Sequence, residues 1–461
     1  MQFKFHLRYL GIALVAGLGF GLRFWQLSRF NSLVFDEVYY VKFAQAYLAG
    51  EAVFDAHPPM GKYALAAGIW LYEHIPWPHV ASQALTAEVS LPTVSYRWMN
   101  ALAGSLVPLI VVGLVNSLTA MHTATQKVSK GWNFGILAGT FVAIDGLFVT
   151  ESRYGLLNIY LVLFGLLGHW LWIAAKRECR PVVKSALSGV SGISLGAAIA
   201  TKWNGLGYVL ALVIWESWQQ LRNKPQSIAT HSDQTSQHQT IFQRVFYLIL
   251  CLGLLPLLTY SLLWWPHILL NEDSFLSIHR TLFWFHQSLE DVQSACSQWF
   301  TWPLLIKPIS YWYEEAGTPA QAQVFAVNNL GNPALWWLSG SSVLLLGIER
   351  LSQLRLSIQQ RSSSVTDYLL IGYLANWLPW MLITRCTYNY LHMPAAVFGF
   401  MLLAWLMSRW LRRESPVSSR WFGFFMLGAI ALAFFFWLPL SLGLPLSAEQ
   451  LQMRWWLPSW I

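Results

Sequence analysis

The sequence predicts an all-α membrane protein that crosses the bilayer many times. Of its 461 residues, 56% are hydrophobic, 16% are aromatic and only 11% are charged, which is far more apolar than a soluble globular protein. A helix needs about 20 mainly apolar residues to cross a bilayer, and the apolar windows supply about eleven such spans. The windows lie near residues 9–27, 96–118, 133–149, 154–175, 185–200, 203–221, 243–265, 334–350, 366–384, 390–408 and 421–440.

The first span follows Lys4 and Arg8 and resembles a signal peptide, but no clear small-residue cleavage site follows it, so we expect it to be retained. With the N-terminus in the cytoplasm, most of the 29 Lys and Arg residues fall in inner segments, as the positive-inside rule requires. Topology thus accounts for the excess of bases over the 21 Asp and Glu. No basic tract typical of nucleic-acid binding appears, and we expect no nucleic-acid partner.

The outer loop 28–95 contains the most distinctive pattern. Asp36 and Glu37 are adjacent acids, and His57, Pro58 and Pro59 follow about twenty residues later. Between them, apolar residues recur at three- and four-residue spacing, which predicts an amphipathic helix on the membrane surface. Asp36 could simply cap this helix. Two adjacent acids followed by His-Pro-Pro favour a functional site.

Charges within or beside membrane spans are costly and often functional. Six more lie toward the expected outer face, namely Arg97, Asp145, Glu151, Arg153, Lys202 and Arg385. Each base alone could extend to the lipid headgroups, Glu151 and Arg153 could balance their own turn, and Asp145 could fix helix packing or take part in catalysis. Together, four bases beside a carboxylate pair predict a site for a lipid-phosphate sugar donor and a hydroxyl acceptor. The bases would stabilise the departing phosphate, and one carboxylate would take the acceptor proton, with inversion at the sugar.

Two later segments complete the organisation. The inner segment 222–243 is polar and predicts a solvated linker rather than a metal site. The outer segment 266–333 is rich in Trp, Phe, His and Pro, which predicts interfacial helices and aromatic anchors. The four cysteines occur singly; only Cys296 and Cys386 fall on the outer side, and we do not expect them to form a disulfide.

Nearly the whole chain resembles the protein O-mannosyltransferases, dolichyl- or polyprenyl-phosphate-mannose–protein mannosyltransferases of the GT-C superfamily. The motifs that carry the resemblance are FDEVYYVKFAQAYLAG, FDAHPPMGKY, IDGLFVTESRYGLLN, ATKWNGLG, WPLLIKPISYWYE, LGNPALWW and YNYLHMPAAVF. The resemblance implies one GT-C transmembrane domain over 1–461. The segment 266–333 is too short for the β-trefoil MIR domain of eukaryotic members, so the chain resembles the compact bacterial type.

The resemblance also implies roles for individual residues. Asp36 would be the catalytic base and Glu37 would help to place the acceptor, while His57 would shape the loop. The resemblance implies substrate-binding roles for Arg97, Arg153, Tyr154, Lys202, Tyr390 and His392, to which the charges at the outer face add Glu151 and Arg385. The usual Tyr-His-Tyr-Leu-Pro run of the family reads Tyr388-Asn389-Tyr390-Leu391-His392-Met393-Pro394 here.

The implied partners are a polyprenyl-phosphate-mannose donor, membrane lipid, and Ser or Thr of a secreted or membrane protein as acceptor. No cofactor or metal is expected, although Asp36, Glu37, His57 and Glu151 could hold a divalent cation. The site would face outward from the plasma membrane. Two other functions fit the same charges: transfer to a lipid or cell-wall polymer, and lipid or solute transport. The lack of an internal repeat and the gathering of charges at one face argue against a transporter.

Overall fold

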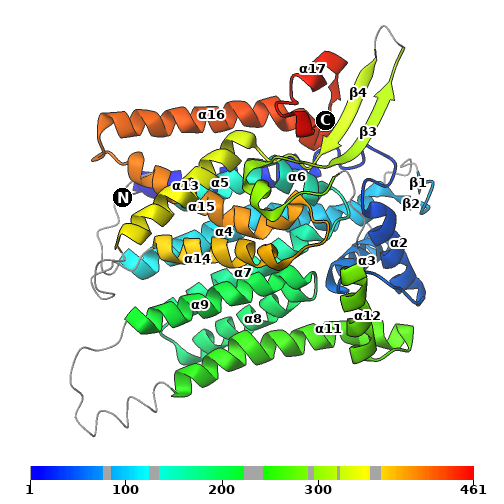
Figure 1. The fold of residues 1–461 in the computed structure, drawn as a ribbon, viewed down its shortest axis with the longest axis horizontal. Coiled ribbons are helices and arrows are strands. Elements are labelled where there is room, and N and C mark those ends of the chain that lie inside the picture. The colour runs from blue at the N-terminus through cyan, green and yellow to red at the C-terminus, as the bar shows by residue number, and fades with distance from the viewer. Residues whose placement is uncertain are drawn as a thin grey trace.

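The computed structural model describes residues 2–75, 85–123, 134–222, 242–288, 295–318, 322–353 and 365–460. The long helices lie roughly side by side in a bundle (Figure 1). They are α1 (Gln2–Phe24), α4 (Thr93–Thr123), α5 (Phe134–Ile144), α7 (Asn158–Arg177), α8 (Pro181–Ile199), α9 (Leu206–Arg222), α11 (Leu255–Asn271), α13 (Pro333–Ser352), α14 (Val365–Trp377), α15 (Met393–Trp410) and α16 (Val417–Leu442). The predicted linker 222–243 falls almost wholly outside the described residues.

Every apolar window predicted from the sequence falls on a helix, so the all-α membrane class is confirmed. The predicted number of eleven membrane spans is not confirmed. By length and composition, six helices of the described chain could each cross a membrane, and a seventh crossing would need α5 and α6 (Gly146–Arg153) together, which meet at 59°. The window over α9 has 17 helical residues, and α14 has 13 before the short 3-10 helix η5 (Leu378–Leu382).

The core of the bundle is built around α15. In the span Asn389–Trp410, which begins with the 3-10 helix η6 (Asn389–His392), 89% of the apolar window is buried, against 22% in the span Phe242–Asn271 at the edge of the bundle. A helix that is apolar all round belongs at such a centre. The outer span leads through a π-helical turn, Ile249–Leu254, into α11.

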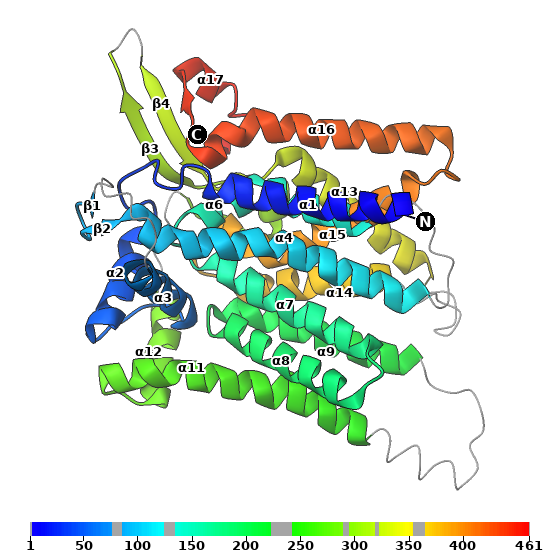
Figure 2. The same ribbon diagram turned by 180° about the vertical axis from the view of Figure 1, so that it is seen from behind.

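The remaining elements gather at one end of the bundle, opposite the N-terminus (Figures 1 and 2). They include α2 (Glu37–Ala49), α3 (Met60–His74) and α12 (Phe275–Ser288). The helix predicted after Asp36 is confirmed as α2, which ends at Gly50 in the left-handed conformation (φ 73°) that glycine adopts readily. Short elements complete this end: η1 (Trp203–Gly205), η3 (Trp299–Leu304), α17 (Ala448–Gln452) and η7 (Pro458–Trp460).

The loop 266–333 differs from the expectation of helices alone. It contains α12 and η3, but also an antiparallel hairpin of β3 (Ser310–Ala316) and β4 (Gln323–Asn328), which β5 (Pro445–Leu446) extends. A second small hairpin joins β1 (Leu85–Thr86) to β2 (Leu91–Pro92). The run Tyr311-Trp312-Tyr313 favours a strand, because aromatic side chains fit a pleated sheet.

The same loop holds a disulfide that the sequence analysis did not expect. Cys296 and Cys386 are bonded, with their Cα atoms 5.2 Å apart, at a sequence separation of 90. Cysteine spacing alone carries no sign of such a pairing, because the fold brings the two residues together.

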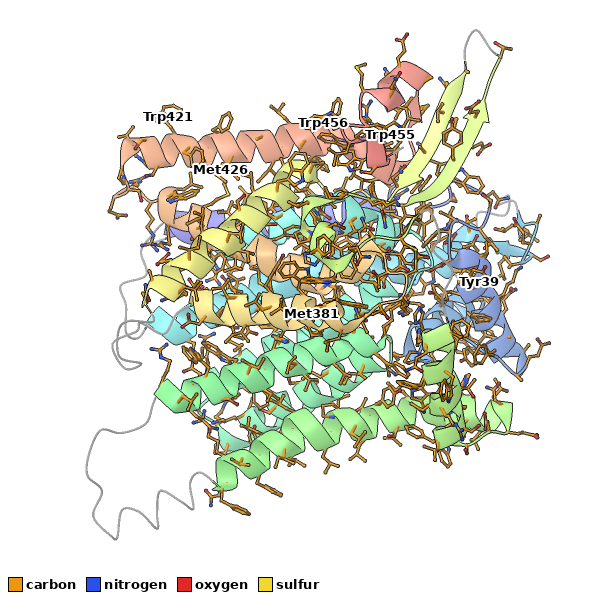
Figure 3. All side chains as sticks on the ribbon, viewed as in Figure 1. Tyr39, Met381, Trp421, Met426, Trp455 and Trp456 are labelled. Carbon is orange, nitrogen blue, oxygen red and sulfur yellow. A yellow bond between two sulfur atoms is a disulfide. The ribbon has the colours of Figure 1, made fainter. Side chains whose placement is uncertain are left out.

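Exposed aromatic side chains mark both ends of α16 (Figure 3). Trp421 is 70% exposed near its start, and Trp456 is 55% exposed beside its other end. Tyr39 lies on α2, at the same end of the bundle as Trp456. Tryptophan and tyrosine concentrate at the two surfaces of a bilayer, so these positions fit helices that run from one surface to the other.

Candidate active site

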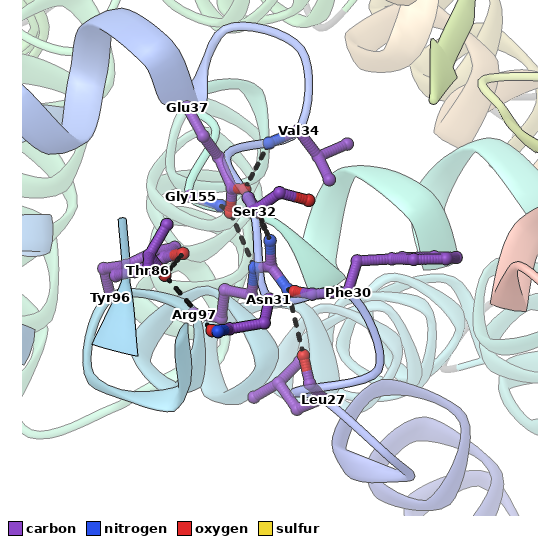
Figure 4. Close-up of polar contacts among 10 residues, drawn as sticks. All are labelled: Leu27, Phe30, Asn31, Ser32, Val34, Glu37, Thr86, Tyr96, Arg97 and Gly155. Carbon is purple, nitrogen blue, oxygen red and sulfur yellow. Dashed lines mark hydrogen bonds and ion pairs between the residues drawn. The ribbon is translucent and has the colours of Figure 1, made fainter. Parts of the chain in front are cut away.

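Glu37, the second acid of the pair, is fully buried and has its hydrogen-bonding capacity taken up (Figure 4). Arg97 on α4 donates from Nε to Glu37 Oε1 at 2.9 Å and from Nη2 to Oε2 at 2.7 Å. The backbone N–H groups of Gly155 and Val34 donate to the same two oxygens at 2.7 and 2.8 Å. With four donors bound to them, the two carboxylate oxygens are not free to place an acceptor.

Arg97 is equally occupied. Its Nη1 donates to the carbonyls of Phe30 (2.9 Å) and Leu27 (3.3 Å), and its Nη2 also donates to Ser32 (2.7 Å). Its guanidinium lies over the Tyr154 ring, 4.9 Å from the centroid. Arg97 and Tyr154, for which the sequence predicts a role in substrate binding, are both buried, and Arg97 supports the loop that leads to Asp36.

Arg153 also holds this connection. Its Nη1 donates to the carbonyls of Leu22 (2.9 Å) and Trp25 (2.7 Å), and its Nη2 to that of Gln26 (3.2 Å). These carbonyls lie at the end of α1, where a helix leaves its last acceptors unpaired and favours a cation. The proposed balance between Glu151 and Arg153 is not observed, because Nη1 and Nη2 of Arg153 are bound to these carbonyls.

Asp36 differs sharply from Glu37. Its carboxylate is half-buried and forms no capping bond to α2, so the capping alternative is not observed. The Tyr40 hydroxyl donates to Asp36 Oδ2 at 3.3 Å. Burial raises the pKa of Asp36, while the nearby Lys202 ammonium and the Tyr40 bond partly oppose this effect. A carboxylate with few donors and a raised pKa is suited to act as a general base.

The backbone before Asp36 is strained. Phe35 has φ 52°, which is uncommon for a residue with a bulky side chain. Its ring stacks on Tyr311 of β3, with centroids 4.0 Å apart and planes 7° apart. Backbone strain of this kind persists only where the surroundings fix it, and it is common at functional sites. The stacking and the Glu37–Arg97 pair fix the turn that presents Asp36.

Glu151 on α6 belongs to the same site. The Tyr311 hydroxyl and Asn158 Nδ2 donate to its two oxygens, the latter at 3.1 Å. The carboxylate is fully buried and lies close enough to Lys202 for a favourable electrostatic interaction. Tyr311, which the sequence analysis did not single out, thus joins the hairpin to both Glu151 and the turn before Asp36.

Lys202 lies between α8 and η1 and is only 4% exposed. Its ammonium lies 5.2 Å from the centroid of the Tyr390 ring, a cation–π distance. Burial lowers the pKa of Lys202, and Asp36, Glu151 and Asp55 oppose that shift. Among the described residues, Lys202 has no hydrogen bond or ion pair through its side chain, which leaves a buried cation available for a ligand.

The loop around His57 closes one side of this site. Lys62 on α3 forms an ion pair with Asp55, and its ammonium donates to the His57 carbonyl at 2.7 Å. His286 on α12 shares a hydrogen bond with the Ala56 carbonyl at 2.9 Å. The backbone of His57 is thus held by Lys62. Asp55 and Lys62 were not predicted as site residues, although they lie in the FDAHPPMGK motif.

A cavity of about 1350 Å³ opens beside Lys202. His57, Lys202 and Arg385 line its polar end. Its apolar walls come from α9, from the end of α14 and from η5, and include Leu206, Val209, Leu210, Val213, Pro379, Leu382 and Ile383. Several of these side chains are exposed on the outside of the bundle, so the cavity is an apolar groove that ends at two cations.

His392, another predicted binding residue, does not line the cavity. His392 is 1% exposed among Trp302, Trp336 and Tyr373, with ring centroids within 6.2 Å. This environment is that of a core histidine. Its neighbour Tyr390 instead lies at cation–π distance from Lys202.

Asp145 has the packing role that the sequence left open. It accepts hydrogen bonds from the backbone N–H groups of Phe148 (3.3 Å) and Asn332 (2.9 Å) and from Trp336 Nε1 (2.8 Å). It therefore caps α6 at the 59° break after α5 and joins α6 to the start of α13. That break directs α6, and with it Glu151, to the site.

Within the described ranges, no group of three or more His, Cys, Asp or Glu residues lies close enough to hold a metal ion. Two of the four residues considered from the sequence for a divalent cation are already occupied by other partners. Glu37 is paired with Arg97, Glu151 with Tyr311 and Asn158.

Comparison with known proteins identifies the family. Residues 13–271 match the family model described as dolichyl-phosphate-mannose-protein mannosyltransferase. The chain belongs to this family. Residues 271–460 also match the model of the C-terminal four-span region of protein O-mannosyltransferases.

Similar sequences and structures cover most of this family member. The polyprenol-phosphate-mannose–protein mannosyltransferase of Mycolicibacterium smegmatis is 24% identical over 493 residues, covering 93% of this chain and 87% of the relative. The protein of the same name in Mycobacterium tuberculosis is 25% identical over 513 residues, covering 97% and 90%.

Among solved structures, the Saccharomyces cerevisiae protein O-mannosyltransferase complex Pmt1–Pmt2, bound to its sugar donor, aligns with a TM-score of 0.81 at 15% identity, covering 98% of this chain and 92% of the yeast chain. ArnT of Cupriavidus metallidurans bound to undecaprenyl phosphate aligns with a TM-score of 0.53 at 14% identity, over 93% and 64% of the two chains. These alignments confirm the predicted GT-C fold.

Proposed function

We propose that this protein transfers mannose from polyprenyl-phosphate mannose to Ser or Thr hydroxyls of secreted or membrane proteins. The observation that carries the proposal is the apolar groove that ends at Lys202 and Arg385, beside Asp36. An isoprenoid chain suits the apolar walls, and a phosphate suits two cations that have no anionic partner at ion-pair distance in the described part of the chain. The names of the mycobacterial relatives support the donor and the protein acceptor.

The reaction is a direct displacement in this proposal. The acceptor oxygen forms a bond to the anomeric carbon while the bond from that carbon to the phosphate oxygen breaks. The acceptor proton passes to the Asp36 carboxylate, and the electron pair of the broken bond leaves with the polyprenyl phosphate. Lys202 and Arg385 stabilise the charge that grows on the phosphate, and the sugar configuration inverts.

The two cations take the place that a divalent metal has in other phosphate-transfer sites. We therefore propose that transfer needs no metal or cofactor. Activity that survives a chelator supports this, and activity that is lost and then restored by added divalent cation contradicts it.

We also propose that the site faces away from the cytoplasm of a plasma membrane. The distribution of Lys and Arg supports this orientation. So does the Cys296–Cys386 disulfide, since disulfides persist in oxidising compartments. Impermeant labelling of Cys296→Ser, which frees the Cys386 thiol, tests it: labelling from the outside of intact cells is expected.

The deciding experiment uses purified protein in lipid nanodiscs with polyprenyl-phosphate mannose and Ser- or Thr-containing peptides. Asp36→Asn is expected to reduce turnover by about 10²- to 10⁴-fold, the usual contribution of a general base, with unchanged thermal stability. Near-normal turnover of this variant removes Asp36 from the base role. Transfer to glycolipid but not to any peptide would point to the alternative acceptor class.

A further inference from the structure

The segment that carries Arg385 contains no helix or strand that could fix the side chain. Residues 383–388 connect η5 to η6 without regular structure. Within the described chain, the only hydrogen bond of the Arg385 guanidinium runs from Nη1 to the Cys386 carbonyl at 3.1 Å. An arginine on a free segment of this kind would lose much conformational freedom when it bound an anion.

The disulfide fixes this segment at the next residue. Cys386 is bonded to Cys296, and two hydrogen bonds follow immediately. Ser297 donates from its backbone N–H to the Thr387 carbonyl at 2.8 Å, and the Thr387 hydroxyl donates to the Ser297 carbonyl at 2.7 Å. One covalent bond and two hydrogen bonds therefore tie the two segments together beside Arg385.

The other side of this cross-link is anchored in the core. Trp302 Nε1 donates to Ser297 Oγ at 3.0 Å, and Trp302 is 1% exposed. Its ring packs against Trp380 of η5, with centroids 5.4 Å apart. Trp377, at the end of α14, donates from Nε1 to the Trp299 carbonyl at 2.9 Å. The disulfide thus joins the Arg385 segment to a cluster of tryptophans, namely Trp299, Trp302, Trp377 and Trp380. This cluster includes η5, which also forms one wall of the groove.

We infer that the Cys296–Cys386 disulfide is a positioning element for the lipid donor, because it holds the Arg385 guanidinium at the polar end of the groove. The inference rests on the proposed role of that groove. The donor-binding site has its full affinity only when the cross-link is intact. The remaining cysteines offer no substitute, since Cys179 is exposed after α7 and Cys251 is buried in another span.

The test compares Cys296→Ser/Cys386→Ser with Cys179→Ser, which keeps the disulfide. Binding of polyprenyl phosphate is measured in nanodiscs, together with KM and kcat for the mannose donor. Loss of one well-placed charged hydrogen bond predicts about tenfold weaker binding and about tenfold higher KM. A donor-positioning role predicts a kcat changed by no more than about twofold, whereas general damage to the fold would lower kcat as well.

A second comparison identifies the residue through which the disulfide acts. Arg385→Gln should weaken binding by itself, and removal of the disulfide from Arg385→Gln should have no further effect. Additive losses, or unchanged binding in the double serine variant, overturn the inference.

If the double serine variant does not fold, a phosphine reductant is applied to the folded wild-type protein. The phosphine supplies two electrons to the Sγ–Sγ bond and takes its oxygen from water, which supplies the two protons of the new thiols. Binding that is unchanged after complete reduction overturns the inference equally. Since the binding of polyprenyl phosphate requires no transfer, a protein that binds this lipid but transfers no mannose contradicts the proposed function alone.

Discussion

Glu37 and Arg97 form a bidentate ion pair inside the protein, with Arg97 Nη2 2.7 Å from Glu37 Oε2, while the adjacent Asp36 has no cation at ion-pair distance among the described residues. The two acids are chemically alike and adjacent in the chain. In the fold, however, Glu37 is part of a buried structural ion pair, while the Asp36 carboxylate remains available for the reaction. This division leads to opposite predictions for the two carboxylates.

Glu37→Gln should destabilise the protein by about 3–5 kcal/mol, because it leaves Arg97 buried without its counter-charge. Thermal unfolding in detergent measures the effect, with Glu51→Gln, an exposed acid just after α2, as the control. A stable but inactive Glu37→Gln variant would instead support direct contact with substrate.

The pH dependence of kcat/KM should be bell-shaped. Asp36 must be deprotonated to act, and its pKa is raised by burial, so activity should fall on acidification at a pH above the ordinary value of about 3.9. Lys202 must be protonated to bind phosphate, and burial lowers its pKa, so activity should fall on the alkaline side before the ordinary value of about 10.4.

Lys202→Arg separates the two limbs of this profile. Arginine stays charged at any accessible pH, so the alkaline limb should move upward or disappear, while the acid limb stays in place. An alkaline limb that is identical in the variant and the wild type would show that another group controls it.

Arg385→Gln and Lys202→Gln should each raise the KM for the lipid donor by about tenfold or more, because charge-assisted hydrogen bonds to a phosphate contribute about 1.5–3 kcal/mol. The KM for the acceptor peptide should change little. Arg280→Gln on α12, an exposed base at the same end of the bundle, is the matched control. Equal changes in both KM values would argue against a donor-specific role.

Gly146→Ala should destabilise the protein and lower its activity. A Cβ at Gly146 would lie 2.4 Å from the Leu330 carbonyl oxygen and 2.8 Å from Ser441 Oγ, so α6 would have to shift and take Glu151 with it. Gly340→Ala, where a Cβ meets nothing within 4 Å, should be neutral or slightly stabilising, since alanine is the better helix former. Thermal unfolding and transfer assays on both variants check this.

The sequence predicted the helices well because the bilayer imposes a strong requirement on hydropathy, and each predicted window lies on a helix. It also located the loop with Asp36 and the positions of Lys202 and Arg385. Arg97 and Arg153 were predicted to bind substrate, but in the fold both donate to backbone carbonyls that follow or end α1, and Arg97 also pairs with Glu37. Hydropathy and charge cannot reveal such partners, because every residue has a carbonyl.

Other features depend on long-range packing. Tyr311 reaches Glu151 only because the β3–β4 hairpin stands over α6, and Cys296 meets Cys386 only because η3 packs against η5. His392 looked like part of a functional motif, but the fold surrounds it with tryptophans. The FDAHPPMGK motif did contain a local signal for Asp55 and Lys62, since an acid and a base seven residues apart flank its turn.

The groove between α9 and α14 is walled by side chains that also lie on the outside of the bundle, such as Leu210 at 41% and Leu382 at 78% exposure. The hydrocarbon chain of a lipid donor can therefore enter the groove laterally from the surrounding bilayer without passing through water. The acceptor polypeptide would reach Asp36 from the aqueous side, so the two substrates would enter the site by separate routes. The product polyprenyl phosphate should then inhibit competitively with respect to polyprenyl-phosphate mannose, but not with respect to the acceptor peptide.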